Sequence, residues 1–165
     1  MTKTKYIFVD LDETLIYCNP WNDEPIKGSG IITLEHNDTY RAVLRPGALE
    51  LLKALREIAP CYILTAAIQE YVQGWNREFK LGFKNSQIYH RGDINIRGGI
   101  QLSGFPNAQT YLIDNLRRKE NMSKIEFLNL IDPDPKYFNI KPYYGFETQD
   151  VTVEMIQEIV TFVTE

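Results

Sequence analysis

Short apolar runs alternate along this chain with stripes of apolar residues that recur at helical spacing. Residues 6–9 form a continuous run of aromatic and β-branched side chains that ends in an aspartate, which is typical of a strand covered on both faces. Residues 61–64 and 111–113 form two more runs of this kind. Because helical patterns separate such runs, the sequence predicts an α/β fold with a mostly parallel central sheet flanked by helices.

Three amphipathic patterns predict the helices. The first follows residues 45–47 and stops at Pro60, the second ends at Gly82, and the third begins near Asp150, which we expect to be its N-cap. Their apolar positions are Ala48, Leu51, Leu52, Leu55 and Ile58; Ile68, Tyr71, Val72, Trp75 and Phe79; and Met155, Ile156, Ile159, Val160 and Val163. Residues 125–131 form a further short apolar run, which we interpret as a fourth strand.

An insert separates the first predicted strand from the first predicted helix. Residues 18–30 combine Asn, Pro, Trp, Asp and Gly without periodicity and therefore predict a loop. Residues 31–34 and 40–44 read as two strands joined by a His-Asn-Asp turn, which predicts a β-hairpin. We therefore expect a loop and hairpin insert over about residues 16–44.

The composition predicts one globular domain over residues 1–165, with 44% hydrophobic and 24% charged residues. A formal net charge of −4 argues against general affinity for the nucleic-acid backbone, which depends on clustered Lys and Arg. Since no apolar run approaches the roughly 20 residues that span a bilayer, we expect no membrane association and a cytoplasmic location. The oligomeric state does not follow from the sequence.

Two aspartates, Asp10 and Asp12, follow the first predicted strand directly. In an extended segment or loop this spacing can direct both carboxylates into one pocket, where one attacks an electrophile and the other transfers a proton. The alternative is a pair of solvated turn aspartates. A calcium-binding EF-hand loop is excluded, because Leu15 and Trp21 stand where that loop needs Gly and Glu.

The segment Asp10-Leu11-Asp12-Glu13-Thr14-Leu15 resembles the first motif, DxDx(T/V), of phosphatases of the haloacid dehalogenase (HAD) superfamily. The sequence of this segment is most similar to that of the FCP/SCP-like, NLI-interacting-factor-like group, which acts on the C-terminal domain of RNA polymerase II. Further blocks resemble that group in the same order: Leu44-Arg45-Pro46-Gly47, Ile63-Leu64-Thr65-Ala66, Tyr89-His90-Arg91-Gly92 and Leu112-Ile113-Asp114-Asn115. The resemblance covers about residues 5–120 and implies a HAD-type Rossmann-like fold.

The resemblance implies catalytic roles for several residues. Asp10 would be the nucleophile that forms a phosphoaspartyl intermediate, and Asp12 would protonate the leaving group and then activate water. Thr65 would bind the transferring phosphoryl group with its hydroxyl, although an ordinary N-cap threonine fits the same position. Thr14 and Ala66 would complete the phosphate-binding set.

A magnesium site is also implied. Asp114 would hold Mg²⁺ together with the Asp10 carboxylate and the Asp12 backbone carbonyl, and Asn115 would orient a metal-bound water. Few protein oxygens suffice, because Mg²⁺ keeps water and phosphate among its ligands. Taken alone, a strand-end Asp followed by Asn is more often a turn former.

The family's third motif supplies a lysine that pairs with the nucleophile, and no lysine follows His90-Arg91-Gly92 closely. Arg97 is the nearest cation and is the expected replacement, both as a catalytic and as a phosphate-binding residue, since guanidinium binds phosphate bidentately. Lys84 is the other candidate, and a solvated surface lysine is the alternative interpretation of it.

The resemblance therefore implies a Mg²⁺-dependent phosphomonoester hydrolase. Only about 30 residues separate the first motif from residues 44–47, so no large cap is expected and the site would be open. Open sites of this superfamily imply macromolecular substrates, with phosphoserine or phosphothreonine of a protein as the first class. The alternatives are a phosphatase of small or nucleotide monophosphates and a non-catalytic binding module that retains the fold.

Overall fold

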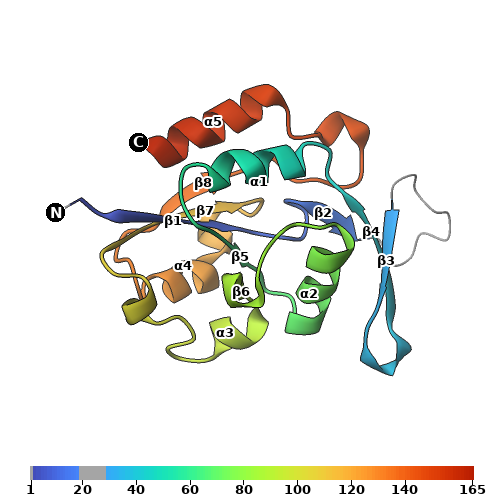
Figure 1. Cartoon of the computed structure of the whole chain (residues 1–165), viewed down its shortest axis with the longest axis horizontal. Helices are drawn as coiled ribbons and strands as arrows, with labels where there is room; N and C mark the ends of the chain where they lie inside the picture. The colour runs from blue at the N-terminus through green and yellow to red at the C-terminus, as the bar shows by residue number, and fades with distance from the viewer. Residues whose placement is uncertain (1, 19–28) are drawn as a thin grey trace.

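A computed structural model describes residues 2–18 and 29–165 (Figure 1). Its central sheet has the strand order β6-β5-β1-β7-β8, and all neighbouring strands are parallel. The strands are β1 (Thr4–Val9), β5 (Cys61–Leu64), β6 (Ile88–Tyr89), β7 (Ala108–Asp114) and β8 (Lys136–Asn139). The predicted α/β fold with a mostly parallel sheet is therefore confirmed.

Alternate residues of β1 face opposite sides of this sheet and define two apolar cores. Ile7 and Val9 belong to the core that α1 (Ala48–Arg56) and α5 (Val153–Thr164) cover. Phe8 belongs to the second core, together with apolar residues of α4 (Met122–Leu128). Figure 1 shows α1 and α5 on one side of the sheet and α3 (Arg91–Asn95) and α4 on the other.

The insert forms a second, antiparallel sheet with the order β2-β4-β3. Its strands are β2 (Ile16–Cys18), β3 (Ser29–Thr33) and β4 (Thr39–Leu44), and the short 3-10 turn η1 (Glu35–Asn37) joins the last two. The predicted hairpin is thus present. The predicted loop falls mainly on residues 19–28, which lie outside the described residues, and its two ends belong to β2 and β3. Within residues 2–18 and 29–165 there is no large cap.

Helix α2 (Gln69–Glu78) lies between the central sheet and the insert sheet (Figure 1). It buries Val72 and Trp75 on its predicted apolar stripe. Gly74 lies against β3, because a Cβ built on it would come within 2.9 Å of Ile32 Cδ1. The absence of a side chain at this position therefore allows the insert sheet to pack closely on α2.

The fold differs from the sequence-based expectations in the following respects. Residues 125–131 are not a strand: most of this run lies in α4, whose buried positions Lys124, Ile125, Phe127 and Leu128 follow helical spacing. Strand β8 was not predicted. The side chain that caps α5 belongs to Thr152, which accepts from Met155 N at 3.1 Å, and not to Asp150.

The remaining short turns are η2 (Asn85–Gln87), η3 (Leu102–Gly104), η4 (Arg118–Glu120) and η5 (Glu147–Gln149). Among the helices in the described part of the chain, none is both long and apolar enough to cross a membrane.

Candidate active site

The loop after β1 directs Asp10 and Asp12 to one side because Leu11 between them is fully buried in the core. The Leu11 carbonyl accepts from Leu15 N at 2.9 Å and Ile16 N at 3.2 Å, which closes the loop into a tight turn. Glu13 takes a left-handed conformation there, with a φ of 65°. Such a backbone costs about 1–2 kcal/mol for a non-glycine residue, so the surrounding hydrogen bonds must hold it.

Three strand ends meet at the carboxyl edge of the central sheet. Asp10 follows β1, Thr65 follows β5, and Asp114 is the last residue of β7. Asp10 and Thr65 line a pocket of about 620 Å³, and Asp114 is fully buried behind it. The structure therefore brings together the residues that the sequence placed at strand ends, as parallel topology requires.

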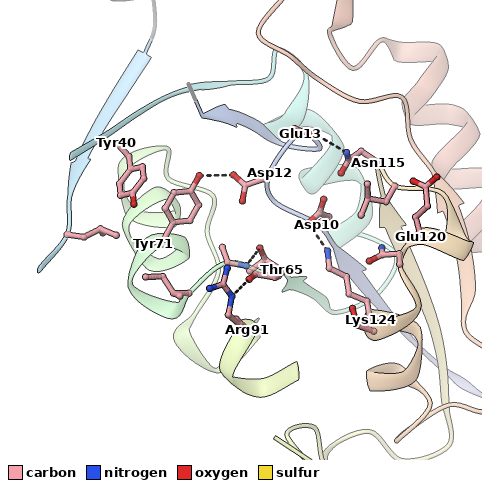
Figure 2. Close-up of a pocket in the computed structure, with 17 residues that line it drawn as sticks. Asp10, Asp12, Glu13, Tyr40, Thr65, Tyr71, Arg91, Asn115, Glu120 and Lys124 are labelled. Carbon is pink, nitrogen blue, oxygen red and sulfur yellow. Dashed lines mark hydrogen bonds and ion pairs between the residues drawn. The ribbon is translucent and has the colours of Figure 1, made fainter. Parts of the chain in front are cut away.

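Lys124 lies between the two strand-end carboxylates, and Figure 2 shows its ammonium directed at Asp10. Its Nζ is 2.8 Å from Asp10 Oδ1 and 2.7 Å from Asp114 Oδ2, and all three side chains are buried. Burial opposes the ammonium charge, but the two carboxylates outweigh it and raise the pKa of Lys124. The lysine is therefore charged and neutralises part of the acidic cluster.

This lysine corrects the expectation for Arg97 and Lys84. Arg97 is exposed beside a tight turn in which Gly99 N donates to Ile96 O at 2.9 Å. Lys84 is exposed and precedes β6, at the amino edge of the sheet. Among the described residues that line the pocket, the basic ones are Lys124 and Arg91. Lys124 falls on a buried stripe only if residues 122–128 are taken as a helix, which the sequence pattern alone did not decide.

Asp10 has a second partner in Thr14. The Thr14 hydroxyl is 3.1 Å from Asp10 Oδ2 and 3.2 Å from Asn115 Oδ1. Thr14 is fully buried, and its hydroxyl links the loop after β1 to the residue that follows β7. It therefore does not lie on the surface of the pocket, where the predicted phosphate-binding role would place it. Burial raises the pKa of Asp10 to about 7, Lys124 lowers it, and Asp114 raises it.

The donor set fits a magnesium ion. A hydroxyl has one proton, so Thr14 can donate to only one of Asp10 Oδ2 and Asn115 Oδ1 at a time, which leaves the other oxygen suited to a cation. No group of three His, Cys, Asp or Glu side chains within the described ranges forms a ready-made metal cage. Two carboxylates with carbonyl oxygens suit Mg²⁺, which rarely uses an all-protein cage.

Thr65 and Ala66 lie in the segment between β5 and α2. Thr65 is buried, and its Oγ1 accepts from Ala67 N at 3.1 Å. The Ala66 carbonyl accepts from Arg91 Nε at 2.8 Å, which fixes the Arg91 side chain beside the pocket. Thr65, Ala66 and Arg91 therefore form a wall that combines a helix N-terminus with a guanidinium, both of which attract anions.

The Asp12 carboxylate lines the same pocket and points toward Tyr71 of α2 (Figure 2). The Tyr71 hydroxyl donates to Asp12 Oδ1 at 2.7 Å. Burial raises the pKa of Asp12, and this hydrogen bond lowers it. Burial also raises the pKa of Tyr71, so the phenol remains the donor. The sequence indicated Tyr71 only as an apolar helix position.

The opposite wall of the pocket is largely apolar. Leu34 and Tyr40 come from the insert sheet and its connection, and Ile68 and Tyr71 come from the start of α2. The pocket thus has a charged floor at the sheet edge and one apolar side, which suits a charged group that carries a larger organic substituent.

A parallel sheet that gathers acidic side chains at one edge, beside a strand-end threonine and a buried lysine, is the arrangement of HAD-type phosphatases. The chain belongs to the NLI interacting factor-like phosphatase family, whose model matches residues 5–164. The resemblance to this group that the motifs implied is therefore confirmed.

Solved structures show the same fold. A variant of the fission yeast RNA polymerase II CTD phosphatase Fcp1 bound to beryllium fluoride aligns with a TM-score of 0.56 and 17% identity, over 98% of this chain and 51% of that one. A structure of Fcp1 described as an essential RNA polymerase II CTD phosphatase gives the same TM-score and identity, over 98% and 48%. The chain spans about half the length of these proteins. None of the curated proteins compared with the chain matches it.

Proposed function

We propose that this chain is a Mg²⁺-dependent phosphomonoester hydrolase that works through a phosphoaspartyl intermediate on Asp10. The observation that carries the proposal is the ion pairing of Lys124 with both Asp10 and Asp114 on the floor of the pocket. A nucleophilic carboxylate must be ionised, and burial opposes this. The neighbouring ammonium lowers the pKa of Asp10 against this effect of burial and so favours the ionised nucleophile.

In the first step, an Asp10 carboxylate oxygen attacks phosphorus and the bond from phosphorus to the leaving oxygen breaks. Asp12 gives its proton to that oxygen. In the second step, Asp12 takes a proton from a water molecule, the water oxygen attacks phosphorus, and the bond to Asp10 breaks. Inorganic phosphate leaves, and both aspartates return to their starting states.

The phosphoryl oxygens would be bound at the start of α2. Since Thr65 Oγ1 accepts from Ala67 N, its own proton can be donated to a phosphoryl oxygen. Arg91 and Lys124 add positive charge on two sides of the pocket. Mg²⁺ would be held by Asp10, Asp114 and the Asp12 carbonyl, with Asn115 beside it, and would supply charge that stabilises the transferring phosphoryl group.

For the substrate, we propose phosphoserine or phosphothreonine in a protein segment. Two observations support this class: the Fcp1 structures belong to phosphatases of the RNA polymerase II CTD, and the described residues place no large cap over the pocket. The apolar wall can accept a side chain that neighbours the phosphorylated residue. Lys124 also argues against a non-catalytic module, because the charge partner of the nucleophile is retained.

Hydrolysis of p-nitrophenyl phosphate tests the mechanism. We expect turnover that EDTA abolishes and Mg²⁺ restores, and we expect Asp10→Asn to lower kcat by at least about 10³-fold. Asp132→Asn is the matched control: Asp132 is also fully buried, but it accepts from Thr110 N at 2.7 Å away from the pocket. Its kcat should equal that of the wild type.

Two further results would decide the proposal. When enzyme turning over labelled substrate is quenched with acid, acid-stable phosphate should remain on Asp10. In a panel of phosphopeptides, nucleotides and small esters, the phosphopeptides should have the highest kcat/KM. Absence of turnover in folded wild type, across divalent metals and pH, would instead indicate a binding module. Preference for nucleotides would retain the mechanism and change the substrate class.

A further inference from the structure

We propose that Tyr71 is the positioning residue for the acid/base Asp12, and that Tyr40 of the insert sheet holds Tyr71 in place. This inference rests on the proposed function, because it assigns the orientation of the proton-transferring group. It gives the insert sheet a part in catalysis through two aromatic side chains.

The first step of the argument is the hydrogen bond itself. At 2.7 Å, the bond from Tyr71 to Asp12 Oδ1 is short and involves a charged or chargeable acceptor, which makes it one of the stronger kinds of hydrogen bond. Tyr71 lies in the first turn of α2, which directly follows the segment with Thr65. The same segment therefore positions both the phosphoryl-binding hydroxyl and the partner of the acid/base.

The second step concerns the support of Tyr71. Its ring contacts Tyr40 of β4 edge-on, with centroids 5.4 Å apart and an interplanar angle of 88°. On the helix side it contacts Trp75 at 6.1 Å and 84°. Figure 2 shows Tyr40 beside Tyr71, and packing between Tyr40 and Trp75 restricts the rotamer of Tyr71. The insert is also tied to α2 by Glu35 N, which donates to Glu70 Oε1 at 2.7 Å.

The third step is chemical. Oδ1 of Asp12 accepts a hydrogen bond from the phenol, so the proton that moves during the reaction is carried by Oδ2. Oδ2 gives this proton to the leaving oxygen as the bond to phosphorus breaks, and regains one from water in the second step. Tyr71 neither gains nor loses a proton in this cycle. Its effect is to hold Oδ2 in the direction of the leaving oxygen, since proton transfer needs that geometry.

The test is the leaving-group dependence of Tyr71→Phe, which keeps the ring packing and removes only the hydroxyl. Phenyl phosphate needs a proton on its departing oxygen because phenol has a pKa of about 10. The p-nitrophenolate ion departs without one. We expect kcat/KM to fall about tenfold for phenyl phosphate and less than about threefold for p-nitrophenyl phosphate. Asp12→Asn should show the same pattern with larger losses.

Tyr111→Phe is the matched control. The Tyr111 hydroxyl donates to the Glu165 carbonyl at 3.0 Å, away from the pocket, so its loss should leave the ratio of the two kcat/KM values unchanged. Tyr40→Leu is a second variant that loosens Tyr71 without touching Asp12, and it should reproduce the selective loss in part. Circular dichroism and thermal melting establish that each variant is folded.

Equal fractional losses for both substrates in Tyr71→Phe, or no loss, would overturn the positioning role. This failure differs from failure of the proposed function, in which wild type would lack turnover or Asp12→Asn would not discriminate between the substrates. If Asp12→Asn discriminates and Tyr71→Phe does not, only the inference about Tyr71 is wrong.

Discussion

Lys124 is the residue on which most of the site's electrostatics depends. A buried ion pair gains little net stability when formed, because both partners lose hydration, but its removal leaves an uncompensated charge. Here the Lys124 Nζ pairs with two carboxylates, at 2.8 Å from Asp10 Oδ1 and 2.7 Å from Asp114 Oδ2. Loss of Lys124 would therefore expose two buried acids to mutual repulsion.

We predict that Lys124→Met lowers kcat/KM at least about 10²-fold, because a preorganised cation next to the transferring group is lost. The same change should lower the free energy of unfolding by about 3–5 kcal/mol. Steady-state kinetics and urea denaturation measure the two effects. Arg97→Met and Lys84→Met are the controls: both side chains are exposed, and both variants should resemble the wild type. A large loss in Arg97→Met would restore Arg97 as the functional cation.

Helix α1 is preceded by a glycine for a steric reason. Gly47 has a φ of 88°, and a Cβ built on it would lie 2.2 Å from the Val151 carbonyl oxygen. At the same place Val151 N donates to Pro46 O at 2.7 Å, so the segment before α5 lies directly on the start of α1. Any side chain at Gly47 must both strain the backbone and displace this segment.

We predict that Gly47→Ala lowers the free energy of unfolding by more than about 2 kcal/mol, from the strained φ and the backbone clash together. Gly104→Ala is a matched control, because a Cβ there meets nothing within 4 Å. That variant should lie within about 0.5 kcal/mol of the wild type. Chemical denaturation of both variants gives the comparison, and equal stabilities would contradict the close approach of Val151 to α1.

At the scale of the whole molecule, the apolar core under α1 and α5 and the pocket occupy different parts of the fold. Helices α1 and α5 cover one face of the sheet, and Ile159 of α5 is fully buried there. The pocket lies at the carboxyl edge and is lined by residues that follow the strands and by residues of α2 and α4. Substitutions in the layer of α1 and α5 should therefore change stability and leave the pocket intact.

We predict that Ile159→Ala lowers the free energy of unfolding by about 2–5 kcal/mol, through lost apolar burial and the cavity that remains. Measured well below the melting temperature, kcat/KM should stay within about twofold of wild type. Glu158→Ala, at the exposed neighbouring position, should leave both quantities unchanged. A matching fall in kcat/KM of folded Ile159→Ala would show that the core and the pocket are coupled.

The sequence alone determined the α/β fold, the hairpin and the acids at the strand ends. These features are local: an apolar run ends in Asp10, another in Asp114, and parallel pairing brings such ends to one edge whatever the loops do. The motif at residues 10–15 indicated the resemblance to HAD phosphatases for the same reason, because the whole motif consists of six consecutive residues.

Only the tertiary structure decided which cation and which hydroxyls surround Asp10 and Asp12. Lys124 is 114 residues from Asp10 along the chain, and Tyr71 is 59 residues from Asp12. The apolar residues after Lys124 fit both a short strand and a helix, and packing against the sheet made them helical, which turned Lys124 inward. Contacts across such separations depend on how faces pack, and local periodicity does not specify that packing.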